Sequence, residues 1–406
     1  MYSKSGLNMR ATTLPSILTV LALILGVGTM GEAQTAGADV AGKGSCSAAS
    51  SAPPDVEEAL DAVLLQVLES PFGSAAGAVI SVRGADWRYV ASAGFADPFA
   101  GAPMDCAMPF QIGSNTKMMT AVVLLQLFEE GRLGLDDPLS RHLPEIASRL
   151  PNGGAITLRQ LAQHTAGVFS YTDNAPDGTP GLMEGGVSDR DVLRRSLEPS
   201  EMINFVVEHG EPVFAPGAEG SWSYSNTGYV LLGMVIETLE GRPLSKSYEA
   251  RIFAPLGMER TYLWNGIPKP EFGLPRAFLA GRDYETTDWN MSQGWAAGGV
   301  ISTVDDMHVF IEALVRGGLF QSPDTLAEMQ ETVPTTNPAL LGYGLGLALK
   351  GQDLWGHGGQ TLGYESDIAA SEDVSLVAFG TSSSNLMALG AAVISGALQS
   401  AGVVPE

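Results

Sequence analysis

A serine and a lysine three residues apart open a long apolar segment in the stretch GSNTKMMTAVVLLQLFEEG, residues 113–131. Residues 118–128 are apolar almost all round, which predicts a helix packed inside the protein. Ser114 is then the expected N-cap, and Lys117 falls in the first turn. A cation is disfavoured at that end because the unpaired amides and the helix dipole already make it positive. The chain has only six lysines, so this position needs a chemical explanation.

Nucleophilic catalysis explains the pair. A serine hydroxyl is a weak nucleophile until a base takes its proton, and Lys117 lies on the same helical face as Ser114, within reach of that hydroxyl. The helix N-terminus favours the neutral, basic form of the amine and leaves the Ser114 N–H available as half of an oxyanion hole. The alternative is structural, because a serine N-cap followed by a lysine also occurs by chance.

Two later stretches carry further candidates. SWSYSNTGYVLLG places Tyr224 and Asn226 just before an apolar helix, where the alternative is that Asn226 only caps the helix. LWGHGGQTLGY places His357 at the end of a strand, and its alternative is a tight hairpin turn with an incidental histidine. The residues that follow it can bring backbone close to a ligand and present an amide, and they are Gly358, Gly359 and Gln360.

The elements that must position these residues are strands near both ends of the chain and helices between them. A first helix in SAPPDVEEALDAVLLQVLESPFG precedes a hairpin in GAVISVRG and DWRYVASAG, and late strands in YGLGLALK, DLWGHGG, YESDIAAS and VSLVAFGT precede a closing helix at 385–402. We predict an α+β fold: an antiparallel sheet built from both ends of the chain, flanked by helices, with an inserted mostly helical domain. The predicted domains are 52–135 with 290–406 for the sheet and 136–289 for the insertion.

Composition limits the class of protein and its partners. The chain has 406 residues, of which 45% are apolar, as expected for a globular protein with a sizeable core, and 17% are charged, which is rather low. Its net charge of -23 argues against nucleic acid and against an anionic membrane surface. We expect a small-molecule or peptide substrate as partner, and the oligomeric state stays open.

The N-terminus has the features of an export signal. Lys4 and Arg10 precede an uncharged apolar run from Leu14 to about Met30, and small residues follow. This pattern predicts a cleaved secretory signal with the start of a linker in residues 1–38, and hence a periplasmic or secreted protein. An uncleaved membrane anchor is the alternative.

Cysteine and histidine usage predicts no metal site and no cofactor. Cys46 and Cys106 both lie in the exported part, where an oxidising compartment permits a disulfide, and two free thiols are the alternative. The five histidines are scattered without the spacing of a zinc site.

In the order S-x-x-K, Y-x-N and H-x-G, the three stretches resemble the serine β-lactamase and penicillin-binding protein superfamily. The chain is most similar to the class C branch, which includes D-alanyl-D-alanine carboxypeptidases, D-aminopeptidases and esterases. The resemblance spans roughly residues 55–385 and includes PFQIGSNTK, GRLGLDDPLSRHLPE, LAQHTAG, PLGMERT and AAGGVISTVDDM. It implies a β-lactamase/transpeptidase-like fold.

The resemblance also implies a role for each matching residue. Ser114 would be acylated, with Lys117 and Tyr224 sharing its proton as general base, and Tyr224 would then reprotonate the leaving group. Asn226 would hold the substrate carbonyl and orient Lys117. The amides of Ser114 and Gln360 would form the oxyanion hole.

The third motif departs from the β-lactamase pattern. His357 replaces a lysine, Gly358 replaces a hydroxyl residue, and Gln360 replaces a serine or threonine. One weak, titratable cation remains, and residues 317–406 contain no arginine, so a substrate carboxylate is disfavoured.

These observations favour an exported serine hydrolase that acts on an ester, an amide or a small peptide, with D-alanyl-D-alanine carboxypeptidase, and so a cell-wall peptide, as its most physiological version. A true β-lactamase is the alternative enzyme. A non-catalytic peptidoglycan-binding relative is the alternative from another class, although it would be free to lose the candidate residues that this chain retains.

Overall fold

The computed structural model describes residues 46, 50–68, 76–183, 189–264, 273–279, 284–381, 396, 398 and 399. These residues belong to one compact unit, Ala41–Glu406. The predicted signal segment and most of the predicted closing helix lie outside the described residues. Within the described part of the chain, no helix is both long enough and apolar enough to cross a membrane.

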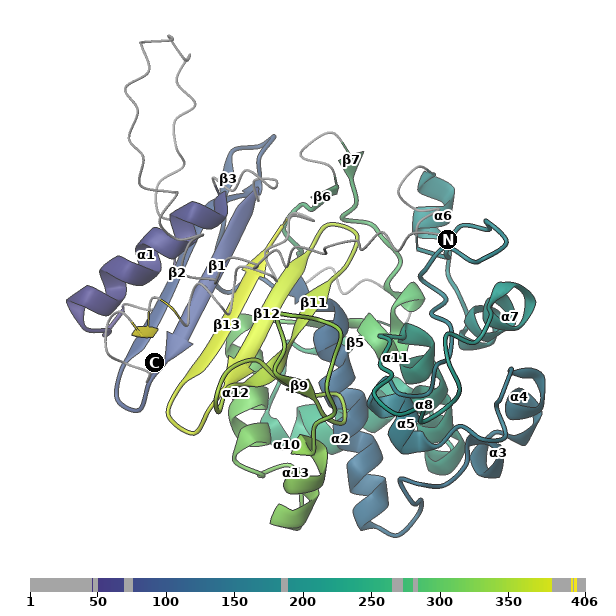
Figure 1. Cartoon of the computed structure of the whole chain (residues 1–406). Coiled ribbons are helices and arrows are strands. Elements are labelled where there is room, and N and C mark those ends of the chain that lie inside the picture. Colours follow the sequence, from purple (N-terminus) through teal and green to yellow (C-terminus); the bar gives the residue numbers. More distant parts are fainter. Residues whose placement is uncertain are drawn as a thin grey trace, which may run out of the picture. The chain divides into compact units, whose positions relative to one another are not determined.

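An eight-stranded antiparallel sheet joins the two ends of the chain, as predicted (Figure 1). Its strands, in spatial order, are β3 (Ala102–Pro103), β2 (Arg88–Asp97), β1 (Gly77–Arg83), β13 (Ser375–Gly380), β12 (Glu365–Ala370), β11 (Trp355–Gln360), β10 (Ala348–Leu349) and β9 (Gly342–Tyr343). The junction is between β1 and β13, whose register runs from Ala78 opposite Gly380 to Arg83 opposite Ser375.

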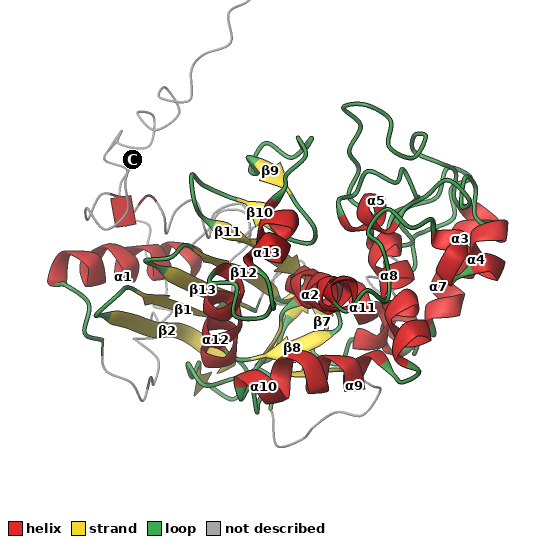
Figure 2. Cartoon of the chain, turned by 90° about the horizontal axis from the view of Figure 1, so that it is seen from below, coloured by secondary structure: helices red, strands yellow, loops and turns green. Residues whose placement is uncertain are grey.

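Alternation along the strands divides the apolar side chains between two faces of the sheet. On β1, Ile80 and Val82 belong to a cluster with α1 (Pro54–Leu68), whereas Val79 belongs to the larger core on the opposite face. Figure 2 shows α1 on one face and α12 (Val304–Val315) on the other. Burying an aliphatic side chain on either face contributes about 1.5–3 kcal/mol, so the pattern determines which face each helix covers.

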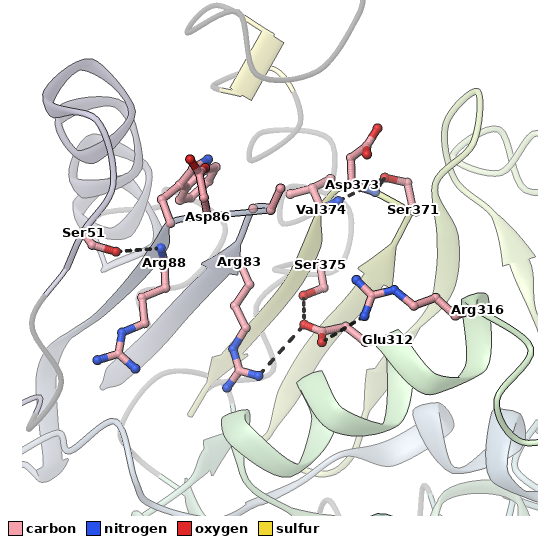
Figure 3. A pocket seen from close by; sticks show the side chains of 13 residues that line it. Ser51, Arg83, Asp86, Arg88, Glu312, Arg316, Ser371, Asp373, Val374 and Ser375 are labelled. Carbon is pink, nitrogen blue, oxygen red and sulfur yellow. Dashed lines mark hydrogen bonds and ion pairs between the residues drawn. The ribbon is translucent and has the colours of Figure 1, made fainter.

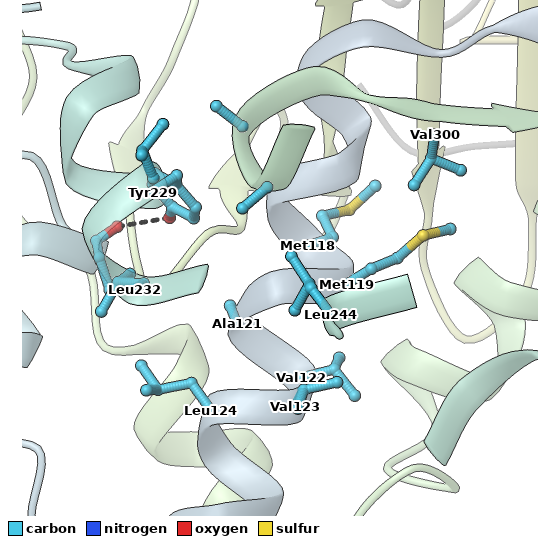
Figure 4. Packing of buried hydrophobic residues seen from close by; sticks show 14 of the residues in the cluster. Met118, Met119, Ala121, Val122, Val123, Leu124, Tyr229, Leu232, Leu244 and Val300 are labelled. Carbon is cyan, nitrogen blue, oxygen red and sulfur yellow. Dashed lines mark hydrogen bonds between the residues drawn. The ribbon is translucent and has the colours of Figure 1, made fainter. Parts of the chain in front are cut away.

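The helix predicted from residues 118–128 is the central helix of the larger core. It is α2 (Thr116–Glu129), and its side chains from Met118 to Leu125 are buried. Figure 4 shows them packed against neighbours that include Tyr229, Leu232 and Val300. A helix that is apolar on all sides is stable only in such a position.

The start of this helix differs from the prediction. A short 3-10 turn, η3 (Gly113–Asn115), precedes α2, and the N-cap is Asn115 rather than Ser114. Bonds from the Asn115 and Thr116 amides to the carbonyls of Ile112 and Gly113 tighten this turn. The Ser114 side chain therefore does not cap the helix and is available for another contact.

A helical layer and two small sheets complete the described fold. The helices from the middle of the chain are α3 (Leu139–His142), α4 (Pro144–Arg149), α5 (Leu158–Ala162), α6 (Arg190–Arg194), α7 (Pro199–His209), α8 (Asn226–Glu240), α9 (Leu244–Tyr248), the π-helical η5 (Glu249–Phe253) and α10 (Ala254–Leu256). Later helices are η6 (Met291–Gln293), α11 (Trp295–Gly298) and α13 (Pro323–Gln330). The small sheets are β4 (Phe110–Gln111) with β8 (Val300–Ser302) and β5 (Tyr262–Leu263), and β6 (Phe278–Leu279) with β7 (Tyr284–Glu285). The predicted domain boundaries within this unit stay a prediction.

Cys46 and Cys106 form a disulfide, with their Cα atoms 5.2 Å apart. This resolves the two alternatives left open by the sequence. The bond links the segment before α1 to the segment after β3.

Candidate active site

The nucleophile turn is attached to the sheet by buried polar contacts. The side-chain amide of Asn115 donates to Ser366 Oγ at 2.8 Å, and Ser366 Oγ donates to the Ile112 carbonyl at 2.9 Å. Asn115 and Ser366 are fully or almost fully buried, whereas Ser114 between them and solvent is partly exposed. Ser114 is therefore the residue of this turn whose side chain is partly accessible, while its neighbours Gly113 and Asn115 are buried. Sequence reasoning missed both supporting residues.

Two glycines permit the close contact between this turn and strand β11. Gly113 has φ of 50°, and a Cβ atom there would lie 2.7 Å from the Gln360 nitrogen. A Cβ atom on Gly359 would lie 2.0 Å from the Ile112 carbonyl oxygen. Any side chain at these positions would separate the turn from the strand.

Lys117 is completely buried and makes three polar contacts. Its Nζ lies 3.0 Å from Ser114 Oγ, 2.7 Å from Asn226 Oδ1 and 2.8 Å from the carbonyl oxygen of Ala297. Burial lowers the pKa of Lys117 well below its ordinary value. The sequence predicted this direction from the helix N-terminus, but the cause in the structure is loss of solvent.

The partners of the neutral amine determine where its lone pair points. A neutral amine has two N–H bonds, and the oxygens of Asn226 and Ala297 can only accept hydrogen bonds. Both N–H bonds are used by these two acceptors. The lone pair is therefore left to accept the hydroxyl proton of Ser114, at 3.0 Å. This arrangement can remove a proton from the serine.

The orientation of Asn226 is set by the loop that follows α5. Asn226 Nδ2 donates to Thr172 Oγ1 at 3.0 Å, and its backbone N–H donates to Ser170 Oγ at 3.2 Å. These bonds keep Oδ1 on the side of Lys117. Nothing in the sequence identified Ser170 or Thr172 as partners of Asn226, or the Ala297 carbonyl as a partner of Lys117.

Tyr224 lies beside the pair. Its ring centre is 4.7 Å from Lys117 Nζ, and its hydroxyl is hydrogen-bonded to Ser114. Burial raises the pKa of Tyr224 and the Ser114 hydrogen bond lowers it, with burial the larger effect. The side chain is therefore a neutral phenol at physiological pH.

His357 is buried and neutral, which corrects the expectation of a titratable cation. Its Nδ1 lies 2.5 Å from the Gly358 carbonyl, so Nδ1 carries the proton, and Nε2 accepts from Tyr343 Oη at 2.9 Å. Burial lowers the pKa of His357 to about 3. Lys350, which precedes this strand, is ion-paired with the buried Asp367.

The backbone of β11 directs one amide away from its neighbour β12. Thr361 N–H donates to the Tyr364 carbonyl, which closes the hairpin between the two strands. Because antiparallel ladders alternate, the backbone groups of the next pair, Gln360 and Glu365, are not hydrogen-bonded to each other. The Gln360 N–H points away from β12, and Gly113 of the nucleophile turn lies against this part of the strand.

A surface pocket lies elsewhere on the molecule and contains none of the predicted site residues. It has a volume of about 490 Å³ and lies between the β1–β2 turn, the β12–β13 turn and α12 (Figure 3). Arg83 is 2.6 Å from Asp305 and 3.9 Å from Glu312, and Arg316 is 3.8 Å from Glu312. Arg83 and Arg316 are therefore both ion-paired with Glu312, and the candidate site remains at Ser114.

The chain belongs to the Beta-lactamase family, whose sequence pattern matches residues 65–394. This match confirms the resemblance noted from the three motifs. Esterase EstB of Burkholderia gladioli is 33% identical over 227 residues, which make up 53% of this chain and 53% of EstB. The chain spans about half the length, or less, of the first curated relatives that it matches.

Solved structures with the same fold cover most of the chain. A D-stereospecific amidohydrolase from Streptomyces sp. has a TM-score of 0.68 and 33% identity, covering 79% of this chain and 94% of that chain. The D-amino acid amidase from Ochrobactrum anthropi SV3, complexed with D-phenylalanine, has a TM-score of 0.72 and 26% identity, covering 86% and 99%. These similarities confirm the predicted fold class.

Proposed function

We propose that this chain is a serine hydrolase that cleaves a small ester or amide through an acyl-enzyme on Ser114. The observation that carries the proposal is the buried Lys117, whose lone pair is left to accept the Ser114 proton. An oriented base next to a partly exposed hydroxyl is what nucleophilic catalysis requires.

In acylation, Ser114 Oγ bonds to the substrate carbonyl carbon while its proton passes to Lys117. The amides of Ser114 and Gln360 donate to the developing oxyanion, and each such donor typically contributes about 3–4 kcal/mol. The bond to the leaving group then breaks. Tyr224, a neutral phenol, gives its proton to the leaving oxygen or nitrogen and regains one from Lys117.

Water completes the cycle by the reverse sequence. It attacks the acyl carbon and loses a proton to Lys117 through Tyr224. The bond between the acyl carbon and Oγ breaks, Ser114 regains its proton, and a carboxylic acid is released.

The substrate class follows from the charges around β11. Among the described residues here, His357 is neutral and Lys350 is paired with Asp367. A free carboxylate next to the scissile bond would therefore lack a counter-ion. We propose substrates without that carboxylate, such as esters and D-amino-acid amides, in preference to peptides ending in D-alanyl-D-alanine. The names of EstB and of the two amidohydrolases support this preference.

We further propose that the protein acts outside the cytoplasm. The disulfide between Cys46 and Cys106 supports this, because disulfides persist in oxidising compartments.

Labelling and turnover test the proposal together. A fluorophosphonate should add its mass to the peptide that contains Ser114, and the Ser114→Ala variant should stay unlabelled. Turnover should then be compared for a p-nitrophenyl ester, a D-amino-acid amide, a D-alanyl-D-alanine peptide and a chromogenic cephalosporin. Preference for the ester or amide is expected. Preference for the cephalosporin would establish the β-lactamase alternative, and an unlabelled, inactive wild type would favour the binding relative.

A further inference from the structure

We infer that His164 is a positioning residue that holds the Tyr224 phenol in place beside Ser114 and Lys117. The inference rests on the proposed function, because it concerns the proton that Tyr224 delivers to the leaving group. His164 lies in the stretch LAQHTAG, just after α5 (Leu158–Ala162).

His164 binds the backbone on both sides of Tyr224. The Ser223 N–H donates to the His164 carbonyl at 3.0 Å, and the Ser225 N–H donates to Nδ1 of the His164 ring at 3.1 Å. The segment with Tyr224 at its centre therefore has both flanking amides bonded to one residue.

The ring of His164 also contacts the ring of Tyr224 directly. The two ring centres are 4.3 Å apart, with an angle of 36° between the planes. Only 2% of His164 is exposed, so the contact is sheltered from solvent. Backbone and ring contacts together limit both the position and the tilt of the phenol.

The hydrogen bonds determine the proton position on His164. Since Nδ1 accepts from Ser225, the proton is on Nε2. A doubly protonated ring would place an N–H against the Ser225 N–H and a positive charge near Lys117. Burial also lowers the pKa of His164, in agreement with this geometry. A neutral imidazole is required, because only an unprotonated Nδ1 can accept the hydrogen bond from the Ser225 N–H.

Unfavourable backbone geometry is retained at this residue. His164 has φ of 62°, a left-handed conformation that is uncommon for residues other than glycine, although histidine adopts it more often than most. The short helix α5 before it is fixed by a capping box between Thr157 and Gln160. It also packs on α8, where a Cβ atom on Gly228 would lie 3.0 Å from the Leu161 carbonyl oxygen. Strain of this kind is common where a site requires one orientation.

Two substrates whose leaving groups differ in their need for a proton can distinguish a positioning role of His164 from a role in stability alone. A p-nitrophenolate leaves as a stable anion, whereas the nitrogen of an anilide must be protonated as it leaves. Displacing a general acid by about 1 Å can cost roughly 100-fold. Loss of the His164 contacts should therefore lower kcat/KM for the anilide far more than for the nitrophenyl ester of the same acid.

The variants are His164→Ala, which removes ring and acceptor, and His164→Asn, which keeps an acceptor near the Nδ1 position and tolerates the positive φ. We expect His164→Ala to lower kcat/KM about 100-fold for the anilide and less than about 5-fold for the ester. His164→Asn should recover about 10-fold on the anilide, because the bond to Ser225 is restored. The melting temperature and the fraction of Ser114 that is labelled are used to correct each rate for unfolded protein. If His164→Ala does not fold, His164→Asn is compared with the wild type on both substrates instead.

Two reference variants make the outcomes distinct. Tyr224→Phe should show the same selective loss on the anilide, and His142→Asn, at a histidine that bonds Asp137 instead, should change neither substrate. Equal losses of His164→Ala on both substrates, or no recovery in His164→Asn, would overturn the inference. An unlabelled wild type, or no selective loss in Tyr224→Phe, would instead overturn the proposed function.

Discussion

Lys117 Nζ lies 2.7 Å from Asn226 Oδ1, although 109 residues separate them in the sequence. This contact, with the Ala297 carbonyl, uses both N–H bonds of the neutral amine and aims its lone pair at Ser114. The catalytic proposal therefore depends on a tertiary contact between the starts of two helices, α2 and α8.

Replacing Lys117 tests the base. Lys117→Met keeps the length of the side chain but has no proton acceptor of comparable strength, so kcat/KM should fall by about 10²–10⁴. Steady-state kinetics on the best ester measures this loss. Wild-type kinetics in the variant would remove Lys117 from the mechanism.

The same variant reports on the protonation of Lys117 through stability. Burial lowers the pKa of Lys117, so the unfolded chain binds the extra proton between that pKa and the ordinary value of about 10.4. The wild type should therefore gain stability relative to Lys117→Met as pH rises through this range, by up to about 1.4 kcal/mol per pH unit. Urea unfolding at several pH values measures the difference, and a difference that shrinks with rising pH would contradict a neutral buried amine.

A charge at position 226 should shift the pH profile. In Asn226→Asp a carboxylate replaces the amide oxygen next to Lys117 and raises the pKa of the amine. The base is then active only at higher pH, so the acidic limb of the kcat/KM profile should move upward. Asn226→Leu is the matched control, since it removes the acceptor without adding charge and should lower the rate without that upward movement.

Substitutions at two glycines that flank α2 can distinguish the effect of backbone strain from the effect of site geometry. Gly113 and Gly131 have φ of 50° and 69°, but only Gly113 faces the backbone of Gln360. Gly131→Ala should cost about 1–2 kcal/mol of stability and leave kcat/KM unchanged. Gly113→Ala should also displace an oxyanion donor and lower kcat/KM by about 10²–10³. Equal kinetics in both variants would mean that contact with β11 is not needed for catalysis.

Buried histidines should make the protein sensitive to mild acid. Burial lowers the pKa of His164, His308 and His357, so each stays neutral in the folded state and takes up a proton on unfolding below its ordinary pKa of about 6.5. The free energy of unfolding should fall between pH 6.5 and 5 by up to about 1.4 kcal/mol per pH unit for each histidine. Denaturant titrations measure the slope. His308→Gln, at a residue held between Ser81 and Ser375, should reduce it by about a third.

Local patterns were sufficient for much of the fold. The apolar run at 118–128 predicted an internal helix, and short strand-like runs near both ends of the chain predicted the strands that pair as β1 and β13. The short 3-10 turn at Gly113–Asn115 was missed, because it depends on how Asn115 meets Ser366 in a strand far along the chain. The predicted signal segment falls outside the described residues and stays a prediction.

Residue types and spacing identified the candidates Ser114, Lys117, Tyr224, Asn226 and His357, since these patterns are local properties of the sequence; the structure places His357 inside β11 rather than at a strand end. Only the tertiary structure decided which of them meet, which supporting groups orient them, and which are charged. A histidine expected to be a weak cation is neutral, and Lys117 owes its lowered pKa to burial rather than to the helix end. The reason is physical: solvent exclusion and hydrogen-bond partners come from segments distant in sequence, and these determine the protonation of a side chain.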